Sequence, residues 1–275
     1  GGHVIRNYWY YVPVGDISAE RIGLFGVVGG DAVIKDLGVE QVRATSNESW
    51  GYNAVVGGMI SELKDNAAVE SCYVRNIVAD TKNVNVGVLG GMVGLVSGAG
   101  ATVKNCYCLE FTEIDDCVST EDGLIGKIDN VLAVENCYSA STFATVKSDI
   151  ANRVKNCYTI SKQGWAPGGY QRAGESITAS KLKAAVYKLG AGFKEGGEET
   201  LGFPALLWQN VTTIVYDSFD TDVPLDKENF VYECEFNYKT DEKISFYFEN
   251  TSGSYANELV TLDQGVFYIA SNEIK

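Results

Sequence analysis

One short string recurs along this chain and constrains its fold more than any other feature. The string consists of an apolar residue, a charged residue, Asn, Cys and Tyr. One strong copy has Ser in place of Asn, and two weaker copies begin at Ile5 and Ile34. The strong copies are Val69–Tyr73, Val103–Tyr107, Val134–Tyr138 and Val154–Tyr158. Such a repeated string predicts stacked structural repeats.

The intervals between the copies vary, although the string itself does not. Successive copies start 29, 35, 34, 31 and 20 residues apart, counting from Ile5. A fixed string at variable intervals predicts a solenoid whose strands are constrained and whose loops are not. Between the copies lie glycine-rich strings whose glycines are too frequent for helices, so we expect a second short strand in each repeat. These strings are Gly23–Gly30, Val55–Met59, Leu89–Gly94 and Gly123–Gly126.

Together, the two kinds of string resemble the GLUG-motif repeat family over roughly Gly23 to Tyr158. The resemblance implies a right-handed parallel β-helix. Members of that family are large secreted or surface-attached bacterial proteins, including adhesins and modules that stand beside peptidases or polysaccharide-degrading domains. The family supplies no catalytic residue that could be carried over to this chain.

We expect an all-β chain in three parts: the β-helix repeats over 1–162, a capping segment over 163–209 and a partial antiparallel β domain over 210–275. In the capping segment, Thr178 can cap a short helix of about Ala179–Leu189 that stops at Gly190. A cap of this kind would close the last repeat, which otherwise exposes apolar surface and unpaired strand groups. The third part alternates as five short strands of a β-sandwich would.

Charge and hydropathy exclude two classes of partner. The formal net charge is −14, and residues 209–275 hold 13 of the 36 acidic side chains but only 4 of the 22 basic ones. Nucleic acids and anionic membranes both require a basic face. No apolar run approaches the ~20 residues of a membrane-spanning helix. Because the chain begins at Gly1 inside a repeat-like string, we expect it to be an excerpt of a longer protein.

The cysteines of the repeated string share one structural position. We predict a stack of buried free thiols, because neighbouring parallel strands lie ~4.8 Å apart whereas a relaxed disulfide prefers Cβ atoms ~3.8 Å apart. A disulfide between Cys106 and Cys137 remains the less favoured alternative. The stacked positions are Cys72, Cys106, Cys137 and Cys157.

The asparagines and tyrosines of the string suggest two further rows of side chains. Asn tolerates a left-handed corner, and its amide can hydrogen-bond to the equivalent Asn one repeat away; this row comprises Asn7, Asn105, Asn136 and Asn156. The tyrosines follow the inward cysteines, so alternation places them outward. They form either a ligand-binding platform for sugar faces or, as we favour, an aromatic ladder covered by neighbouring loops. This row comprises Tyr73, Tyr107, Tyr138 and Tyr158, with Trp9.

An acidic insertion over 109–123 contains no basic residue. Clustered carboxylates can bind Ca²⁺, which takes six to eight oxygen ligands. The candidate ligands are Glu113, Asp115, Asp116 and Asp122. The spacing matches neither an EF-hand nor a nonapeptide calcium repeat, so we favour a solvated acidic loop.

No catalytic site can be assigned from the sequence. His3 is the sole histidine, which rules out a His-Glu-x-x-His zinc site in this chain. Arg153 and Lys155 lie near Asp149, but ordinary surface charge explains them. We therefore predict a non-catalytic, secreted or cell-surface scaffold of a bacterial protein that contacts an extracellular glycan or a host or cell-surface protein. The alternative is a module of a polysaccharide lyase or glycosidase with a groove along a β-helix face.

Overall fold

The protein is described by a computed structural model, which covers residues 1–275. It describes 2–12, 21–46, 54–80, 87–114, 121–160, 166 and 168–212, and the short stretches 231–234, 244–247, 259–262 and 267–270. The chain divides into two compact units, Gly1–Ile214 and Val215–Lys275. Each unit is considered by itself below.

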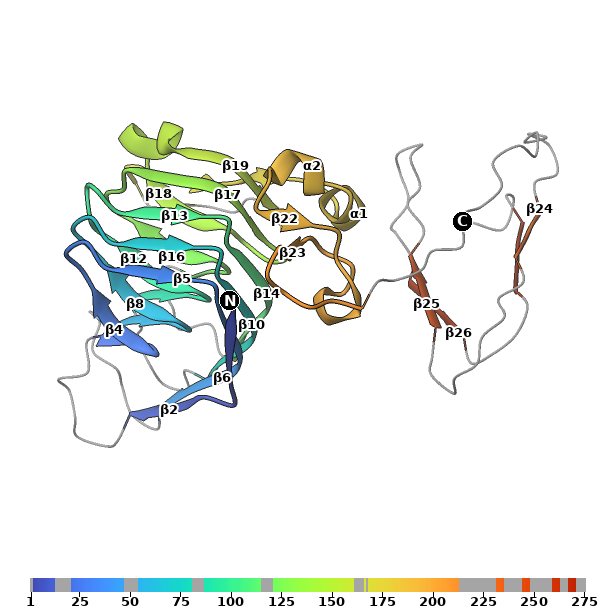
Figure 1. Ribbon diagram of the computed structural model, residues 1–275, viewed down its shortest axis with the longest axis horizontal. Helices are drawn as coiled ribbons and strands as arrows, with labels where there is room; N and C mark the ends of the chain where they lie inside the picture. Colours follow the sequence, from blue (N-terminus) through green and yellow to red (C-terminus); the bar gives the residue numbers. More distant parts are fainter. Residues whose placement is uncertain are drawn as a thin grey trace. The chain divides into compact units, whose positions relative to one another are not determined.

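The first unit is mostly β and is built from parallel sheets, as the sequence predicts (Figure 1). The largest sheet has two strand positions per repeat: β1 (His3–Arg6), β2 (Trp9–Val12), β6 (Leu37–Ser46), β10 (Tyr73–Asp80) and β14 (Tyr107–Ile114), and β5 (Val33–Lys35), β9 (Ala68–Glu70) and β13 (Thr102–Lys104). The strands β17 (Ala133–Ser139) and β19 (Val154–Thr159) span both positions, and β21 (Glu175–Ser176) pairs with β19.

Two smaller sheets complete each repeat. One contains β3 (Arg21–Ile22), β7 (Val55–Gly57), β11 (Val88–Gly90) and β15 (Glu121–Asp122). The other contains β4 (Phe25–Val28), β8 (Ile60–Leu63), β12 (Val93–Val96), β16 (Ile125–Ile128), β18 (Ala144–Lys147) and β20 (Tyr170–Ala173). Among the described strands of these two sheets, only β20 is antiparallel to its neighbour. The chain therefore passes through the sheets in turn and returns to pair with its own previous pass.

The register of these pairs reproduces the sequence repeat. Val103 pairs with Val69 on one side and with Val134 on the other, and Val154 and Ile34 continue the row. The predicted copies beginning at these residues are thus structurally equivalent. We refer to residues 2–176, which carry these pairs, as the parallel array.

The weak copy at Ile5 was assigned to the wrong position. Ile5 pairs with Val39 and not with Ile34, so Asn7 occupies a second corner of the repeat. The two corners are alike because both require the left-handed conformation after an apolar and a charged residue. The second corner comprises Asn7, Gln41, Asn76 and Glu110, and the first comprises Asp36, Ser71, Asn105, Asn136 and Asn156, all with φ between 50° and 60°.

The predicted amide ladder is present at the first corner. Nδ2 of Asn136 donates to Oδ1 of Asn105, and Nδ2 of Asn156 donates to Oδ1 of Asn136, each over 3.3 Å. Asn7 stands at the other corner and takes no part in this row. Only three of the four predicted asparagines therefore form the ladder.

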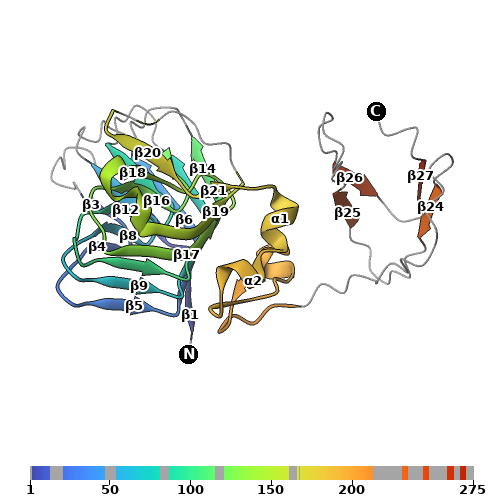
Figure 2. The same ribbon diagram turned by 90° about the horizontal axis from the view of Figure 1, so that it is seen from above.

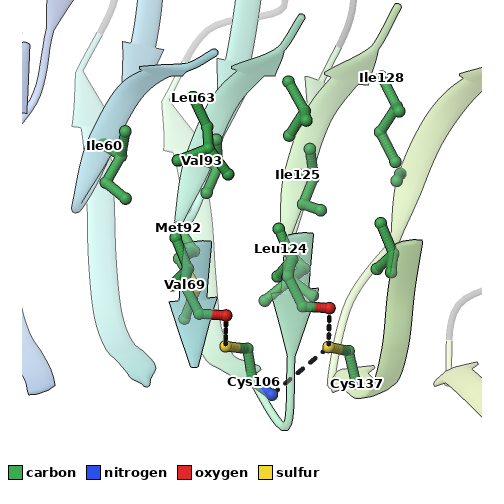
Figure 3. Packing of buried hydrophobic residues seen from close by; sticks show 14 of the residues in the cluster. Ile60, Leu63, Val69, Met92, Val93, Cys106, Leu124, Ile125, Ile128 and Cys137 are labelled. Atoms are coloured by element: carbon green, nitrogen blue, oxygen red, sulfur yellow. Dashed lines mark hydrogen bonds between the residues drawn. The ribbon is translucent and has the colours of Figure 1, made fainter. Parts of the chain in front are cut away.

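The core of the array lies between the sheets and contains the predicted thiol stack. Cys72, Cys106, Cys137 and Cys157 are buried and free. Each thiol donates to a backbone carbonyl, as Figure 3 shows for Cys106 to Val69 and for Cys137 in the next pass. Apolar side chains of the smaller sheets, such as Ile60, Val93 and Ile125, fill the space beside them. The thiols therefore act as small core side chains.

The glycine-rich strings allow the sheets to turn tightly. A Cβ atom on Gly90 would lie 2.0 Å from the carbonyl oxygen of Val93, and one on Gly57 would lie 1.9 Å from that of Ile60. Both obstacles are backbone atoms, which cannot rotate away. The glycines at these equivalent places are thus required by close backbone approach.

Residues 177–212, which we call the lateral segment, follow the array. They contain α1 (Ala179–Lys183), α2 (Val186–Leu189), β22 (Phe193–Lys194) and β23 (Ala205–Leu206). The described residues of this unit also form 3₁₀ turns at Ser148–Arg153 and Glu198–Thr200. Thr178 caps α1 as predicted, accepting a hydrogen bond from the Lys181 backbone. The expected single helix is divided in two, because the Ala185 N–H bonds to Leu182 in a tighter turn.

The position of the lateral segment differs from the prediction. It lies along the side of the array, beside β17 and β14, and runs back from the last repeat toward the first (Figures 1 and 2). Trp208 donates a 2.8 Å hydrogen bond from Nε1 to the carbonyl of Ser71, and its ring lies against Gly2. The apolar side chains of the segment cover the tyrosine row, including Tyr158 of the last repeat.

The second unit is described at four strands in antiparallel pairs. β24 (Val231–Cys234) pairs with β27 (Phe267–Ala270), and β25 (Ile244–Tyr247) pairs with β26 (Leu259–Leu262). Antiparallel pairing agrees with the alternation in the sequence. The expected strand around residues 214–216 lies outside the described residues.

Candidate functional site

The tyrosine row is the candidate site that the sequence singled out. Its rings stack face to face along the array: the centroids of Tyr73 and Tyr107 are 5.1 Å apart, and those of Tyr107 and Tyr138 are 5.0 Å apart. The interplanar angles are 11° and 7°. The parallel register produces this stack, because it places each Tyr opposite the next. Tyr158 continues the row on β19.

The lateral segment covers this row. Tyr73, Tyr107, Tyr138 and Tyr158 are 3%, 1%, 0% and 7% exposed. They form one apolar cluster with side chains of the lateral segment: Leu182, Ala185, Leu189, Phe193, Phe203 and Leu206. Trp208 and Phe193 tilt against the end and the middle of the stack.

The tyrosine hydroxyls are engaged as well. The Tyr107 hydroxyl exchanges hydrogen bonds with the Gln209 side chain, 3.0 Å to Oε1 and 2.7 Å to Nε2. The Tyr138 hydroxyl donates to the carbonyl of Pro204, and the Tyr73 hydroxyl donates to Glu40. Gln209 Oε1 also accepts the Leu206 N–H over 2.7 Å. These three buried phenols therefore have partners, as buried polar groups require.

The glycan-platform hypothesis for these four tyrosines is wrong on two grounds. Their rings are buried, so a sugar cannot reach them without displacement of the lateral segment. Their faces also point at one another, whereas a sugar packs on a free ring face. The alternative reading, an aromatic ladder under a cover, describes the structure. Trp9, the remaining aromatic residue of that hypothesis, is 66% exposed and lies at the second corner.

Burial controls the ionisation of this cluster. It raises the pKa of the Tyr73, Tyr107 and Tyr138 phenols above their usual value. It likewise raises the pKa of the Cys106 and Cys137 thiols, which therefore remain protonated at neutral pH. Reactive cysteines have lowered pKa values, so these thiols serve packing.

Charged residues of the repeat alternate in sign along one row. In the paired register, Lys35, Glu70, Lys104, Glu135 and Lys155 follow one another across five passes. The Lys104–Glu135 pair is an ion pair of 3.1 Å with both side chains part exposed. Exposed pairs contribute only ~0–1 kcal/mol each. Their alternation favours the observed register, because a slip by one residue would separate the opposite charges.

A second charged row lies at the other corner and reaches the lateral segment. Arg6 bonds to Glu40 at 2.7 Å, and Arg75 bonds to Glu110 at 2.6 Å. Arg75 also donates to the backbone carbonyl of Glu199. The hydrogen bond from Arg6 to Glu40, together with the charge of Glu40, raises the pKa of Arg6. These charges connect passes and hold the lateral segment.

The candidate calcium ligands fall largely outside what the structure describes. Asp115 and Asp116 lie outside the described residues. Glu113 is the next-to-last residue of β14, and Asp122 belongs to β15. In the described part of the chain, no group of three or more His, Cys, Asp or Glu side chains is placed to hold a metal ion. Calcium binding by the acidic insertion stays a prediction.

A hollow of about 310 Å³ lies at the last repeat of the array. Its wall comes from β19, β20 and β21 and from the 3₁₀ turn before β19. Polar residues that are not linked by any sequence motif, Gln171, Arg172 and Glu175, line it together with Asn156. The pairing of β20 with β18 and of β21 with β19 brings them together, and no motif in the sequence signals that pairing.

Comparison with protein-family models, with curated proteins and with solved structures finds no match. The resemblance to GLUG-motif repeats therefore stays a prediction from the repeated strings. The helices of the described residues include none long and apolar enough to cross a membrane.

Proposed function

We propose that residues 1–214 are a parallel β-helix that serves as a non-catalytic scaffold of a secreted or cell-surface bacterial protein and contacts extracellular glycans. The observation that carries this proposal is the side-on stacking of equivalent strands in all three sheets. Val, Cys, Asn and charged residues each recur at one position over successive passes. A structure of this kind presents long regular faces to solvent, which suits contact with an extended polymer.

Three features support the scaffold part of the proposal. Each pass contacts its neighbours through stacked thiols, amides and rings. The lateral segment joins separate passes along one side. The closely spaced charges described above lie between passes and hold them together. Charged side chains along these rows therefore link neighbouring passes to one another.

A glycan array probed with the whole chain tests the proposal. We expect binding to a limited set of neutral or weakly charged glycans above that of an unrelated acidic protein of matched net charge. Release of reducing ends from the bound glycans is measured in parallel. No bound glycan would refute the contact, and catalytic release of reducing ends would refute the scaffold and establish the polysaccharide-degrading alternative.

A further inference from the structure

The hollow at the last repeat stands where the asparagine ladder ends. The ladder is directional, since each amide donates to the amide of the preceding pass. Asn156 therefore uses its Nδ2 on Asn136, and its Oδ1 accepts no hydrogen bond from the described residues. Hydrogen-bonded amides polarise one another, which makes the terminal carbonyl oxygen a better acceptor. Asn156 is exposed and lines the hollow.

The rim of the hollow adds groups of both hydrogen-bonding kinds. Arg172 adds its backbone to the wall, because its side chain turns to the outer face of the sheet, where Nη1 donates to Thr145 Oγ1 over 2.9 Å and Thr145 pairs with Lys127. Glu175 follows Gly174, whose φ of +88° turns the chain so that β21 can lie beside β19. Both Glu175 and Gln171 are exposed. The rim thus offers carboxylate and amide oxygens as acceptors, and amide N–H groups as donors.

The wall of the hollow is also partly apolar, with Ala151, Val154 and Ala173 lying among the polar groups. Most of the exposed wall is nevertheless polar, which suits a ligand rich in hydroxyl groups. A volume of ~300 Å³ is the lower end of the usual range for ligand sites. The space therefore suits one small, polar, uncharged molecule.

We propose that this hollow binds a single neutral sugar residue of a glycan. Sugar hydroxyls donate to Asn156 and Glu175 and accept from Gln171, while a C–H face of the ring packs on Ala151, Val154 and Ala173. The carboxylate of Glu175 disfavours an anionic sugar. This inference rests on the proposed glycan contact and assigns it to the end of the array, away from the tyrosine row.

Saturation-transfer NMR on the whole chain tests the site. The probes are the methyl glycosides of glucose, galactose and mannose, with glucuronate as the anionic comparison. We expect transfer to at least one methyl glycoside at millimolar concentration and weaker transfer to glucuronate. The absence of transfer to all three methyl glycosides, or tighter binding of glucuronate, would overturn the proposal.

Matched substitutions locate the binding. Asn156→Gly should weaken binding about 3- to 10-fold through the loss of one hydrogen bond. Glu175→Gln should weaken it by about 3-fold or more, because a neutral amide oxygen is a weaker acceptor than a carboxylate. Glycine preserves the left-handed backbone of Asn156, whose φ is 51°. The controls are Glu195→Gln on an exposed loop and Asn7→Gly at the other corner, which should leave the affinity unchanged. Equal losses in the controls would place the sugar elsewhere.

The same variants separate this site from the wider proposal. If the Glu175→Gln and Asn156→Gly variants retain full binding on the glycan array, the hollow is not the contact, although the proposed function stands. If the wild-type chain binds no arrayed glycan but does bind a methyl glycoside in the hollow, the sugar site is supported and the proposed contact with a glycan polymer is refuted. Near-ultraviolet circular dichroism confirms that each variant is folded.

Discussion

We expect the hydroxyl of Tyr107 to stabilise the packing of the lateral segment against the array. The Tyr107→Phe substitution keeps the stacked ring and removes only the oxygen that meets both Nε2 and Oε1 of Gln209. Tyr107 and Gln209 are 1% and 8% exposed, so water cannot replace the lost partner without a rearrangement. Leaving the buried amide N–H unsatisfied costs about 1–3 kcal/mol.

The size of the effect follows from the size of the unit. For a unit of Gly1–Ile214, each kcal/mol lowers the midpoint of thermal unfolding by about 2–4 °C. We therefore expect Tyr107→Phe to lower it by about 2–12 °C, measured by near-ultraviolet circular dichroism of the tyrosines. Guanidinium unfolding of the same variant should show a lower midpoint with an unchanged slope.

Tyr158→Phe is the matched control for this experiment. Tyr158 is also buried in the row, but the described residues give its hydroxyl no hydrogen-bond partner. Its free energy of unfolding should change by no more than about 0.5 kcal/mol. If the two variants lose equal stability, or if Tyr107→Phe loses none, the hydroxyl does not hold the lateral segment and burial of the ring alone does so.

Three further outcomes are expected. In the native chain, Cys106 and Cys137 should resist alkylation and should react only after unfolding. If mass spectrometry of briefly labelled native protein finds either thiol modified, this prediction is wrong. Gly90→Ala should destabilise the unit by about 1–3 kcal/mol or more, because the new Cβ meets a backbone oxygen, whereas Gly168→Ala, in open space, should be neutral in the same denaturation assay. Stability should fall as pH rises beyond about 8.5–10, the ordinary pKa range of Cys and Tyr. The folded-state pKa values of Tyr107 and of the two thiols are raised, so the stability that these groups contribute is complete below their unfolded-state pKa values and is lost as the pH rises above them. A free energy of unfolding that stays constant over this pH range would disprove the prediction.

Much of the array could be predicted from the sequence because its constraints are local. Alternation along a strand places Cys inward, and the left-handed corner selects Asn, so both rows are readable from a string of five residues. The same argument misplaced Ile5, because two corners of each repeat impose the same requirement. Only the pairing with Val39 separates them.

The burial of the tyrosine row under the lateral segment could not be predicted in this way. The side chain that engages Tyr107 is Gln209, 102 residues further along the chain, and Trp208 bonds to a carbonyl 137 residues before it. The aromatic residues and glycines of 190–208 signal a compact segment, but they do not indicate which surface it covers. The hollow at the last repeat escaped prediction for the same reason, since it depends on how β20 and β21 pair.

The lateral segment also couples its own sequence to the number of repeats. Trp208 contacts the pass of Ser71, Gln209 contacts the next pass at Tyr107, and Phe203 contacts the one after at Tyr138. Duplication of a repeat within this span would displace the later partners by about 4.8 Å, one strand spacing. The contact residues of the segment would then no longer match the spacing of the passes in the lengthened array. Gain or loss of a repeat here requires a matching change in residues 177–212, whereas repeats joined beyond the span of the segment meet no such restriction.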